Sequence, residues 1–297
     1  MKFGYWLITN QLFRYKINSF HLCFMATKSK PGNRPLGIFD SGIGGLTVAN
    51  AIHELLPEEN LVYFGDTAHL PYGDKSPEAI KKWSVAISDF LMTHDCKMIV
   101  IACNSISSVA YDAVKKHIGS NAIVVNVIDP VVEYVVNQAA LKRVGVIGTK
   151  ATIKTDIYAS KLKDRNKKLL VNSLATPLLA PMIEEGFFNN KISKTIINDY
   201  LSRPKLKNID SLILGCTHYP LIRPEIEQFY KGKVTIFDTA RIVAHHVQWL
   251  LDENNLFNSG STKKHRFFIS DFTPAFEQST KIFFKGKVKL ERNNLWK

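Results

Sequence analysis

The segment "LILGCTHYP" (residues 212–220) contains the pattern from which the fold can be predicted. Its apolar start is typical of a buried strand, and Cys216, Thr217 and His218 follow where that strand ends, before a proline interrupts regular structure. A second segment, "MIVIACNSIS" (98–107), repeats this layout with Cys103 at the end of its strand. The chain therefore contains a pair of strands that each deliver a thiol among polar residues.

Short apolar runs of this kind recur along the chain and alternate with longer segments of helical pattern. One such helix is expected from Ser76 to His94, because Ser-Pro-Glu is a typical helix start. The candidate strands are residues 36–40, 60–66, 97–103, 122–128, 143–149, 169–175, 211–216 and 233–239. This alternation predicts an α/β protein of repeated βα units with mainly parallel sheets.

The order of the loops indicates an internal duplication. "GIFDSG" precedes "ACNS" by about 63 residues, and "GVIGTKAT" precedes "GCTH" by about 67. We therefore predict two similar doubly wound domains with the active site in the cleft between them, where the carboxyl ends of parallel strands bind ligands. The first lobe is expected to comprise residues 35–125 and 240–297 and to carry Cys103, and the second lobe residues 126–239 with Cys216.

Charge is concentrated at the two ends of the chain. The net charge is +13, yet residues 1–34 hold six Lys/Arg and no acid, and residues 263–297 hold nine Lys/Arg against three acids. Residues 1–34 are expected to be a disordered basic extension, with Met25 as a candidate for the true start. No nucleic-acid-binding signature accompanies the basic ends, so we expect no nucleic acid partner.

The lengths of the apolar runs, the N-terminus and the spacing of the cysteines narrow the class of protein further. No apolar run approaches the roughly 18 residues of a membrane span, and the N-terminus lacks a cleavage site for secretion, so no membrane partner is expected. Four cysteines without a C-x-x-C spacing favour free thiols in the cytoplasm over disulfides or structural zinc. Of these, Cys23 and Cys96 are interpreted as small buried hydrophobic residues.

A dinucleotide-binding turn is the main competing interpretation of the first loop. "DSGIGGLT" (40–47) follows a strand, and Asp66 lies about 20 residues beyond its glycines, as the ribose-binding acid does in that motif. However, Thr47 replaces the third glycine, and Asp40 would place an anion where a pyrophosphate needs positive potential. Cys103 and Cys216 are better candidates for chemistry, because a thiol at a helix N-terminus can be activated.

Six segments, in order, resemble the glutamate racemases of the aspartate/glutamate racemase family over about residues 35–290. They are "GIFDSGIGGLTV", "YFGDTAHLPYG", "ACNSISS", "VGVIGTKATI", "TPLLAPMIEEG" and "LGCTHYPLI". Ser105 departs from the threonine usual in the family but keeps a hydroxyl, and Ile106 and Ser107 replace smaller residues. His69 stands where arginine is frequent, which we expect to affect the surface more than the chemistry.

The resemblance implies a cofactor-independent isomerase that interconverts L- and D-glutamate for peptidoglycan synthesis, without pyridoxal or metal. Racemisation removes an α-proton from one face and returns a proton to the other, so two opposed acid/base groups suit it. By resemblance, Cys103 deprotonates D-glutamate with help from Asp40, and Cys216 deprotonates L-glutamate with help from His218, which Glu184 orients. The implied substrate contacts are Asp40, Ser41, Tyr72, Gly73, Asn104, Ser105, Thr149, Thr152, Thr217 and His218.

Two alternatives stay open at this point. A racemase of another acidic amino acid, such as aspartate, would carry similar two-cysteine machinery, although "CTHYP" favours glutamate. A two-lobed binding protein that has lost turnover belongs to a different class, and the presence of both Cys103 and Cys216 argues against it. By resemblance we also expect a homodimer.

Overall fold

The computed structural model describes residues 30–138, 141–260, 264–272 and 274–297. All eight predicted strands are confirmed, and two more lie near the C-terminus. The strands are β1 (Leu36–Asp40), β2 (Leu61–Gly65), β3 (Met98–Ile101), β4 (Ile123–Asn126), β5 (Arg143–Gly148), β6 (Leu170–Ala175), β7 (Ser211–Gly215), β8 (Thr235–Ile236), β9 (Arg266–Ile269) and β10 (Leu290–Arg292). The candidate start at Met25 lies outside the described residues.

Helices occupy most of the segments between the strands. They are α2 (Leu46–Leu55), α3 (Pro77–Thr93), α4 (Asn104–Ile118), α5 (Asp129–Val136), α6 (Lys150–Lys154), α7 (Ile157–Arg165), α8 (Leu179–Glu184), α9 (Lys191–Leu201), α10 (Arg223–Tyr230), α11 (Thr239–Glu253) and α12 (Pro274–Phe283). Short 3-10 helices include η2 (Thr67–His69), η3 (Tyr72–Asp74) and η5 (Tyr219–Ile222). The helix expected from Ser76 to His94 is α3, whose N-cap Ser76 accepts a hydrogen bond from the backbone N–H of Ala79.

The first sheet has six parallel strands in the order β10-β9-β2-β1-β3-β4. Alternate residues of its central strands enter different cores. Ile38 and Val100 belong to the core beneath α2 and α11, whereas Phe39 and Ile101 belong to the core beneath α3 and α4. Both faces are therefore covered, which is why these strands read as continuous apolar runs rather than alternating ones.

The second sheet has four parallel strands in the order β6-β5-β7-β8. This is the same order as β2-β1-β3-β4 in the first sheet, so the duplication predicted from the loops extends to the strand topology. On one face Val146 and Ile213 pack with Tyr158 and Leu162 of α7. The other face packs against the α8–α10 side, where Leu214 and Ile226 share one core.

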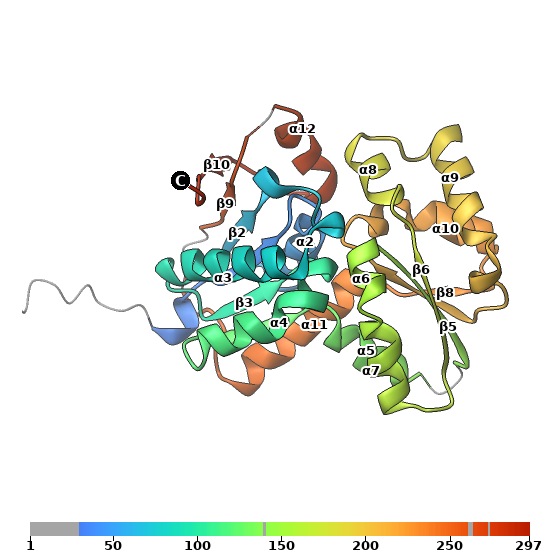
Figure 1. The fold of residues 1–297 in the computed structure, drawn as a ribbon. Helices are drawn as coiled ribbons and strands as arrows, with labels where there is room; N and C mark the ends of the chain where they lie inside the picture. Colours follow the sequence, from blue (N-terminus) through green and yellow to red (C-terminus); the bar gives the residue numbers. More distant parts are fainter. Residues whose placement is uncertain (1–29, 139–140, 261–263, 273) are drawn as a thin grey trace, which may run out of the picture.

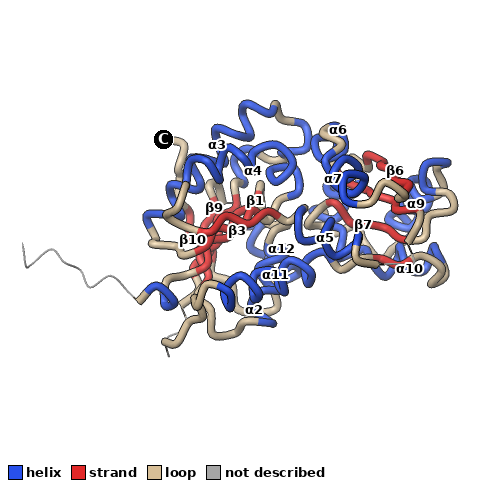
Figure 2. Tube along the Cα trace, turned by 90° about the horizontal axis from the view of Figure 1, so that it is seen from below, coloured by secondary structure: helices blue, strands red, loops and turns tan. Residues whose placement is uncertain are grey.

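We call the six-stranded sheet with its helices the first lobe and the four-stranded sheet with its helices the second lobe. They stand side by side in Figure 1, and Figure 2 shows helices on both sides of each sheet. The long helix α11 contacts both α2 and α5 and so packs against both lobes. Within the described ranges, no helix is both long and apolar enough to cross a membrane.

Candidate active site

The two sheets have equivalent switch points, where the chain reverses its direction of winding. In the first sheet this point lies between β1 and β3, and in the second between β5 and β7. Ligands of open parallel sheets bind beyond the carboxyl ends of such strands. The residues found there are Asp40 and Cys103 in the first lobe, and Thr149 and Cys216 in the second.

One small pocket joins the two switch points. Eleven of the thirteen predicted site residues line it: Ser41, Tyr72, Gly73, Cys103, Asn104, Ser105, Thr149, Glu184, Cys216, Thr217 and His218. Asp40 and Thr152 are instead buried behind the lining, with 0% and 1% of their surface exposed. Leu70, Pro71, Ala180 and Pro181 complete the wall. Sequence reasoning missed these four because apolar residues carry no chemical signal.

Cys103 is the N-cap residue of α4, and its Sγ lies 3.6 Å from the Ser41 Oγ, to which it donates. Burial, and next the negative charge of Asp40, raise the pKa of the Cys103 thiol to about 12. Hydrogen bonds that Cys103 shares with the Ile106 backbone and the Ser41 side chain offset this only in part. Cys103 is therefore held in its protonated form at neutral pH and can act as a proton donor.

Asp40 ends β1 and lies beside this thiol without reaching the pocket surface. Its Oδ2 accepts a hydrogen bond of 3.0 Å from the backbone N–H of Gly42. Burial raises the pKa of the Asp40 carboxyl, against an opposing contribution from the positive charge of His218. Asp40 can therefore influence the charge of Cys103, but a direct contact with a ligand would require the pocket to open.

The second thiol has a different set of neighbours. The Cys216 Sγ lies 3.5 Å from His218 Nδ1, and His218 Nε2 lies 2.8 Å from Glu184 Oε1. The latter is an ion-pair distance, although the N–H bond of the ring is not aligned with the carboxylate oxygen. Burial lowers the pKa of His218, but Cys216 and Glu184 outweigh this and raise it well above its ordinary value. A charged imidazolium therefore stands beside Cys216.

Two glycines allow the loop after β1 to approach these groups closely. A Cβ at Gly44 would lie 2.3 Å from His218 Cε1 and 2.7 Å from Thr217 Oγ1, and a Cβ at Gly45 would lie 2.5 Å from the Asp40 Cβ. No real side chain tolerates such distances, so these positions require glycine for space. In the glycine pattern that resembles a dinucleotide-binding turn, Gly44 thus serves contact between the two lobes and Gly45 close packing within the first.

Thr47, the residue that replaces the third glycine of that turn, also joins the lobes. Its Oγ1 donates a 2.9 Å hydrogen bond to the backbone carbonyl of Thr217. Because Thr47 lies in the first turn of α2, this bond ties that helix to the loop carrying Cys216 and His218. The departure from the dinucleotide motif therefore has a structural function of its own.

Hydroxyl groups connect the lobes on the opposite wall of the pocket. The Ser105 Oγ lies 2.8 Å from the Thr149 Oγ1, which is 3.2 Å from the Thr152 Oγ1. The hydroxyl of Ser105 thus joins the first lobe to the second at this wall. Thr149 is also the N-cap of α6 and accepts from the backbone N–H of Thr152.

Tyr158 is a site residue that sequence reasoning missed. It is buried on α7, and its hydroxyl donates a 2.7 Å hydrogen bond to the Asn104 Oδ1 at the start of α4. Since this bond engages the oxygen of the amide, Asn104 is oriented to present its NH₂ group elsewhere. Its aromatic residue type gave no functional signal, because most buried tyrosines serve packing.

Tyr72 lines the pocket with its body but turns its hydroxyl away from it. The hydroxyl donates a 2.5 Å hydrogen bond to Asp66 Oδ2. Burial and the charge of Asp66 raise the pKa of Tyr72 far above its ordinary value, so it stays neutral. The adjacent Gly73 fits closely against the second lobe, since a Cβ there would lie 3.1 Å from the Thr149 Cβ.

The remaining candidates agree with a structural role or fall outside the site. Cys96 is buried, and burial raises its pKa to about 12, as expected of an inert core thiol. Cys23 lies outside the described residues. Among the residues that the structure describes, no three His, Cys, Asp or Glu side chains are grouped to hold a metal ion.

Comparison with known proteins places this architecture in a family. Residues 45–247 match the model of the Asp/Glu/Hydantoin racemase family. A glutamate racemase of Chlorobaculum parvum is 40% identical over 250 residues, which cover 84% of this chain and 92% of that protein. The crystal structure of a Francisella tularensis glutamate racemase in complex with D-glutamate is 38% identical, with a TM-score of 0.84, and covers 89% of this chain and 99% of that one.

A second solved structure agrees. A glutamate racemase from Bacillus anthracis is 30% identical with a TM-score of 0.82, and covers 88% of this chain and 98% of that one. The family match spans both lobes and includes both cysteines at the switch points. On family model, sequence identity and fold alike, this chain belongs to the Asp/Glu/Hydantoin racemase family.

Proposed function

We propose that this protein interconverts L- and D-glutamate by proton transfer at the α-carbon, with Cys103 and Cys216 as the two acid/base groups. The observation that carries the proposal is the placement of one thiol at each of two equivalent strand ends, lining the same small pocket. A planar carbanion bound between them would have one thiol on each face. Its relatives named glutamate racemases support glutamate as the substrate.

The unequal neighbours of the two thiols suggest how the reaction starts. In the L-to-D direction the base is Cys216, whose Sγ lies 3.5 Å from His218 Nδ1: as a thiolate it removes the α-proton of L-glutamate and becomes a thiol. Cys103, which burial keeps protonated, then gives its proton to the opposite face and becomes a thiolate. The product is D-glutamate, and the reverse reaction exchanges the two roles.

The groups around the pocket suit the polar ends of glutamate. Hydroxyls of Ser41, Ser105, Thr149 and Thr217 and the amide of Asn104 can bind carboxylates, and Tyr72 and Gly73 offer backbone groups. The N-terminus of α4 adds positive potential near Cys103, where enolate charge develops. Asp40 and Thr152 lie behind these groups: the charge of Asp40 raises the pKa of Cys103, and the Thr152 hydroxyl contacts that of Thr149.

We further propose the division into residues 35–125 with 240–297, and 126–239, as the two domains that enclose the substrate. A homodimer in the cytoplasm and a role in supplying D-glutamate for peptidoglycan are what membership of this family leads us to expect. The oligomeric state can be checked by sedimentation of the purified full-length chain.

Turnover of L-glutamate in heavy water tests the two-base reaction. Because the proton removed by Cys216 is not the proton delivered by Cys103, the first D-glutamate formed should carry α-deuterium, and the remaining L-glutamate should stay protiated. Cys103→Ala and Cys216→Ala should each lower racemisation by orders of magnitude while glutamate still binds. Early D-glutamate that is mostly protiated would contradict two opposed bases.

The same purified protein separates the alternatives. L-aspartate assayed in parallel at equal concentration should turn over far more slowly than L-glutamate, and the reverse order would make the protein an aspartate racemase. Binding of glutamate without exchange of its α-proton would instead indicate a binding protein. Initial rates with the two amino acids decide between these outcomes.

A further inference from the structure

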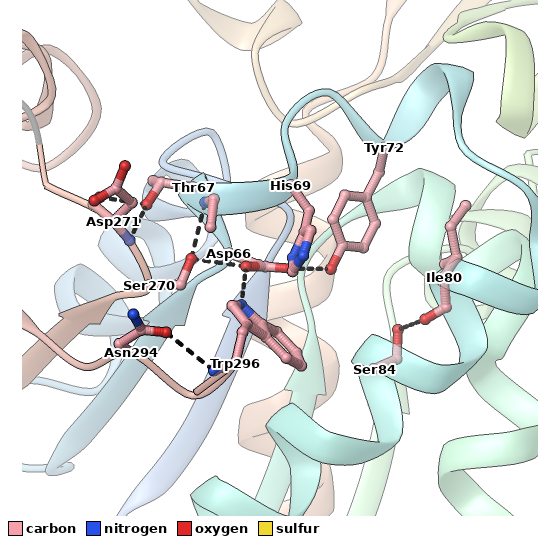
Figure 3. Close-up of polar contacts among 11 residues, drawn as sticks. Asp66, Thr67, His69, Tyr72, Ile80, Ser84, Ser270, Asp271, Asn294 and Trp296 are labelled. Carbon is pink, nitrogen blue, oxygen red and sulfur yellow. Dashed lines mark hydrogen bonds and ion pairs between the residues drawn. The ribbon is translucent and has the colours of Figure 1, made fainter.

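Asp66 is a buried carboxylate that the proposed reaction does not use. It directly follows β2, has 0% of its surface exposed, and accepts four side-chain hydrogen bonds. Oδ2 accepts from Tyr72 at 2.5 Å and lies 2.8 Å from His69 Nδ1, and Oδ1 accepts from Ser270 at 2.7 Å and from Trp296 Nε1 at 2.8 Å. Figure 3 shows these side chains converging on Asp66.

The chemistry of these partners fixes the direction of each bond. An indole N–H only donates, and an ionised carboxylate only accepts at about four positions, which four donors fill. The Tyr72 hydroxyl is therefore a donor to Asp66. Since Tyr72 is part of the pocket wall, its bond to Asp66 holds that wall from the side away from the substrate.

The C-terminal part of the chain completes this arrangement. The Ser270 Oγ also accepts from the backbone N–H of Ala68, and Thr67 Oγ1 both donates to the Asp271 carbonyl and accepts from the Asp271 N–H. These bonds attach the turn after β2 to the end of β9 (Figure 3). The loop that forms one wall of the pocket is thus fastened to residues about 200 positions later.

His69 and Trp296 close the outer side of the cluster. The His69 ring stacks on Trp83 with centroids 4.0 Å apart, and Trp296 meets it edge-on at 4.9 Å. His69 keeps 25% of its side chain exposed while its Nδ1 lies 2.8 Å from Asp66 Oδ2. That its replacement of arginine affects the surface more than the chemistry stays a prediction.

We propose that Asp66 is a positioning residue for the substrate loop Pro71–Gly73, and that Trp296 near the C-terminus is part of the same device. The inference rests on the proposed function, because it assigns these residues to glutamate binding. With Asp66 saturated by donors, the Tyr72 ring has one position, and the backbone of the loop is fixed facing the second lobe. Substrate should then bind without the cost of ordering this wall.

The test compares the kinetics of Asp66→Asn and Trp296→Phe with those of the wild-type full chain. Asn at position 66 brings an NH₂ group against one pair of donors, so the KM for glutamate should rise about tenfold. Trp296→Phe keeps an aromatic ring but removes one donor, so KM should rise about threefold. In both variants kcat should stay within about twofold, because neither residue touches the reacting atoms.

Glu291→Gln is the matched control for a merely structural effect. Glu291 on β10 pairs with Arg266 on β9, so the change weakens the same C-terminal strands without touching Asp66. Its KM should equal that of the wild type even where its melting temperature falls. A KM that rises equally in Glu291→Gln and Trp296→Phe, or that stays unchanged in Trp296→Phe, would overturn the positioning role.

Failure of this inference can be told apart from failure of the proposed function. If the wild-type protein does not racemise glutamate, the proposed function fails whatever the variants do. If it does, and Asp66→Asn and Trp296→Phe keep wild-type KM, only the positioning role fails. Should Asp66→Asn not fold, Trp296→Phe alone decides, since Trp296 is only partly buried.

Discussion

Replacing Gly44 by alanine should damage the Cys216 side of the pocket specifically. The new Cβ would lie 2.3 Å from His218 Cε1 and 2.6 Å from Nδ1, whereas ordinary contact begins at 3.4 Å. The imidazole must therefore retreat by roughly 1 Å, which breaks its 3.5 Å contact with the Cys216 Sγ. A displacement of about 1 Å in a catalytic group costs on the order of 10²-fold in rate, or about 2.7 kcal/mol of barrier.

Rates alone do not show which of the two proton transfers Gly44→Ala has slowed. L- and D-glutamate have equal free energies, so kcat/KM must fall by the same factor in both directions. Kinetic isotope effects distinguish the two steps. If removal of the proton from L-glutamate has become limiting in Gly44→Ala, α-deuterated L-glutamate should show an enlarged isotope effect, and α-deuterated D-glutamate a diminished one.

Gly45→Ala is the mirror-image control at the next position. Its Cβ would press on Asp40, at 2.5 Å from the Cβ and 2.9 Å from the Cγ, on the Cys103 side. The enlarged isotope effect should therefore move to D-glutamate. Thermal unfolding shows whether each variant is folded at the assay temperature. The reasoning is refuted if folded Gly44→Ala keeps kcat/KM within about threefold of wild type, or if both variants change the same isotope effect.

Three further predictions concern other buried groups. Tyr158→Phe removes the donor that orients Asn104 and should raise the KM for glutamate by roughly threefold to tenfold. Initial rates measure this KM, and an unchanged value would contradict the orienting role. The rate of alkylation of Cys103 in the ligand-free protein, followed by mass spectrometry, should rise about tenfold per pH unit from pH 7 to 10 without a plateau. The reason is that only the thiolate reacts and the pKa of Cys103 is raised to about 12; a plateau below pH 9 would contradict this. Lys97→Met should lower the free energy of unfolding by about 3–5 kcal/mol in urea, since it strands the buried charge of Glu59, and a loss below about 1 kcal/mol would contradict that role.

The two strands near the C-terminus mark the limit of pattern reading. The strand β9 is the short run "RFFI" (266–269), and β10 is the largely polar "LER" (290–292) at the sheet edge. Apolar periodicity cannot identify a three-residue edge strand, because one of its sides has no neighbour to demand apolar contacts. Only pairing gives the two segments their structure, β9 with β2 and β10 with β9.

The sequence itself determined the strand positions, the duplicated order of loops and the two thiols at strand ends. It could do so because apolar runs, turn residues and the carboxyl end of a parallel strand are local properties. The contacts that connect the lobes were decided only by the tertiary structure. Asp66 had the spacing of a ribose-binding acid, yet it accepts from Tyr72 and Trp296. Such bonds join residues up to 230 positions apart, and which donor meets a buried acceptor depends on how sheets and helices pack, which no local pattern encodes.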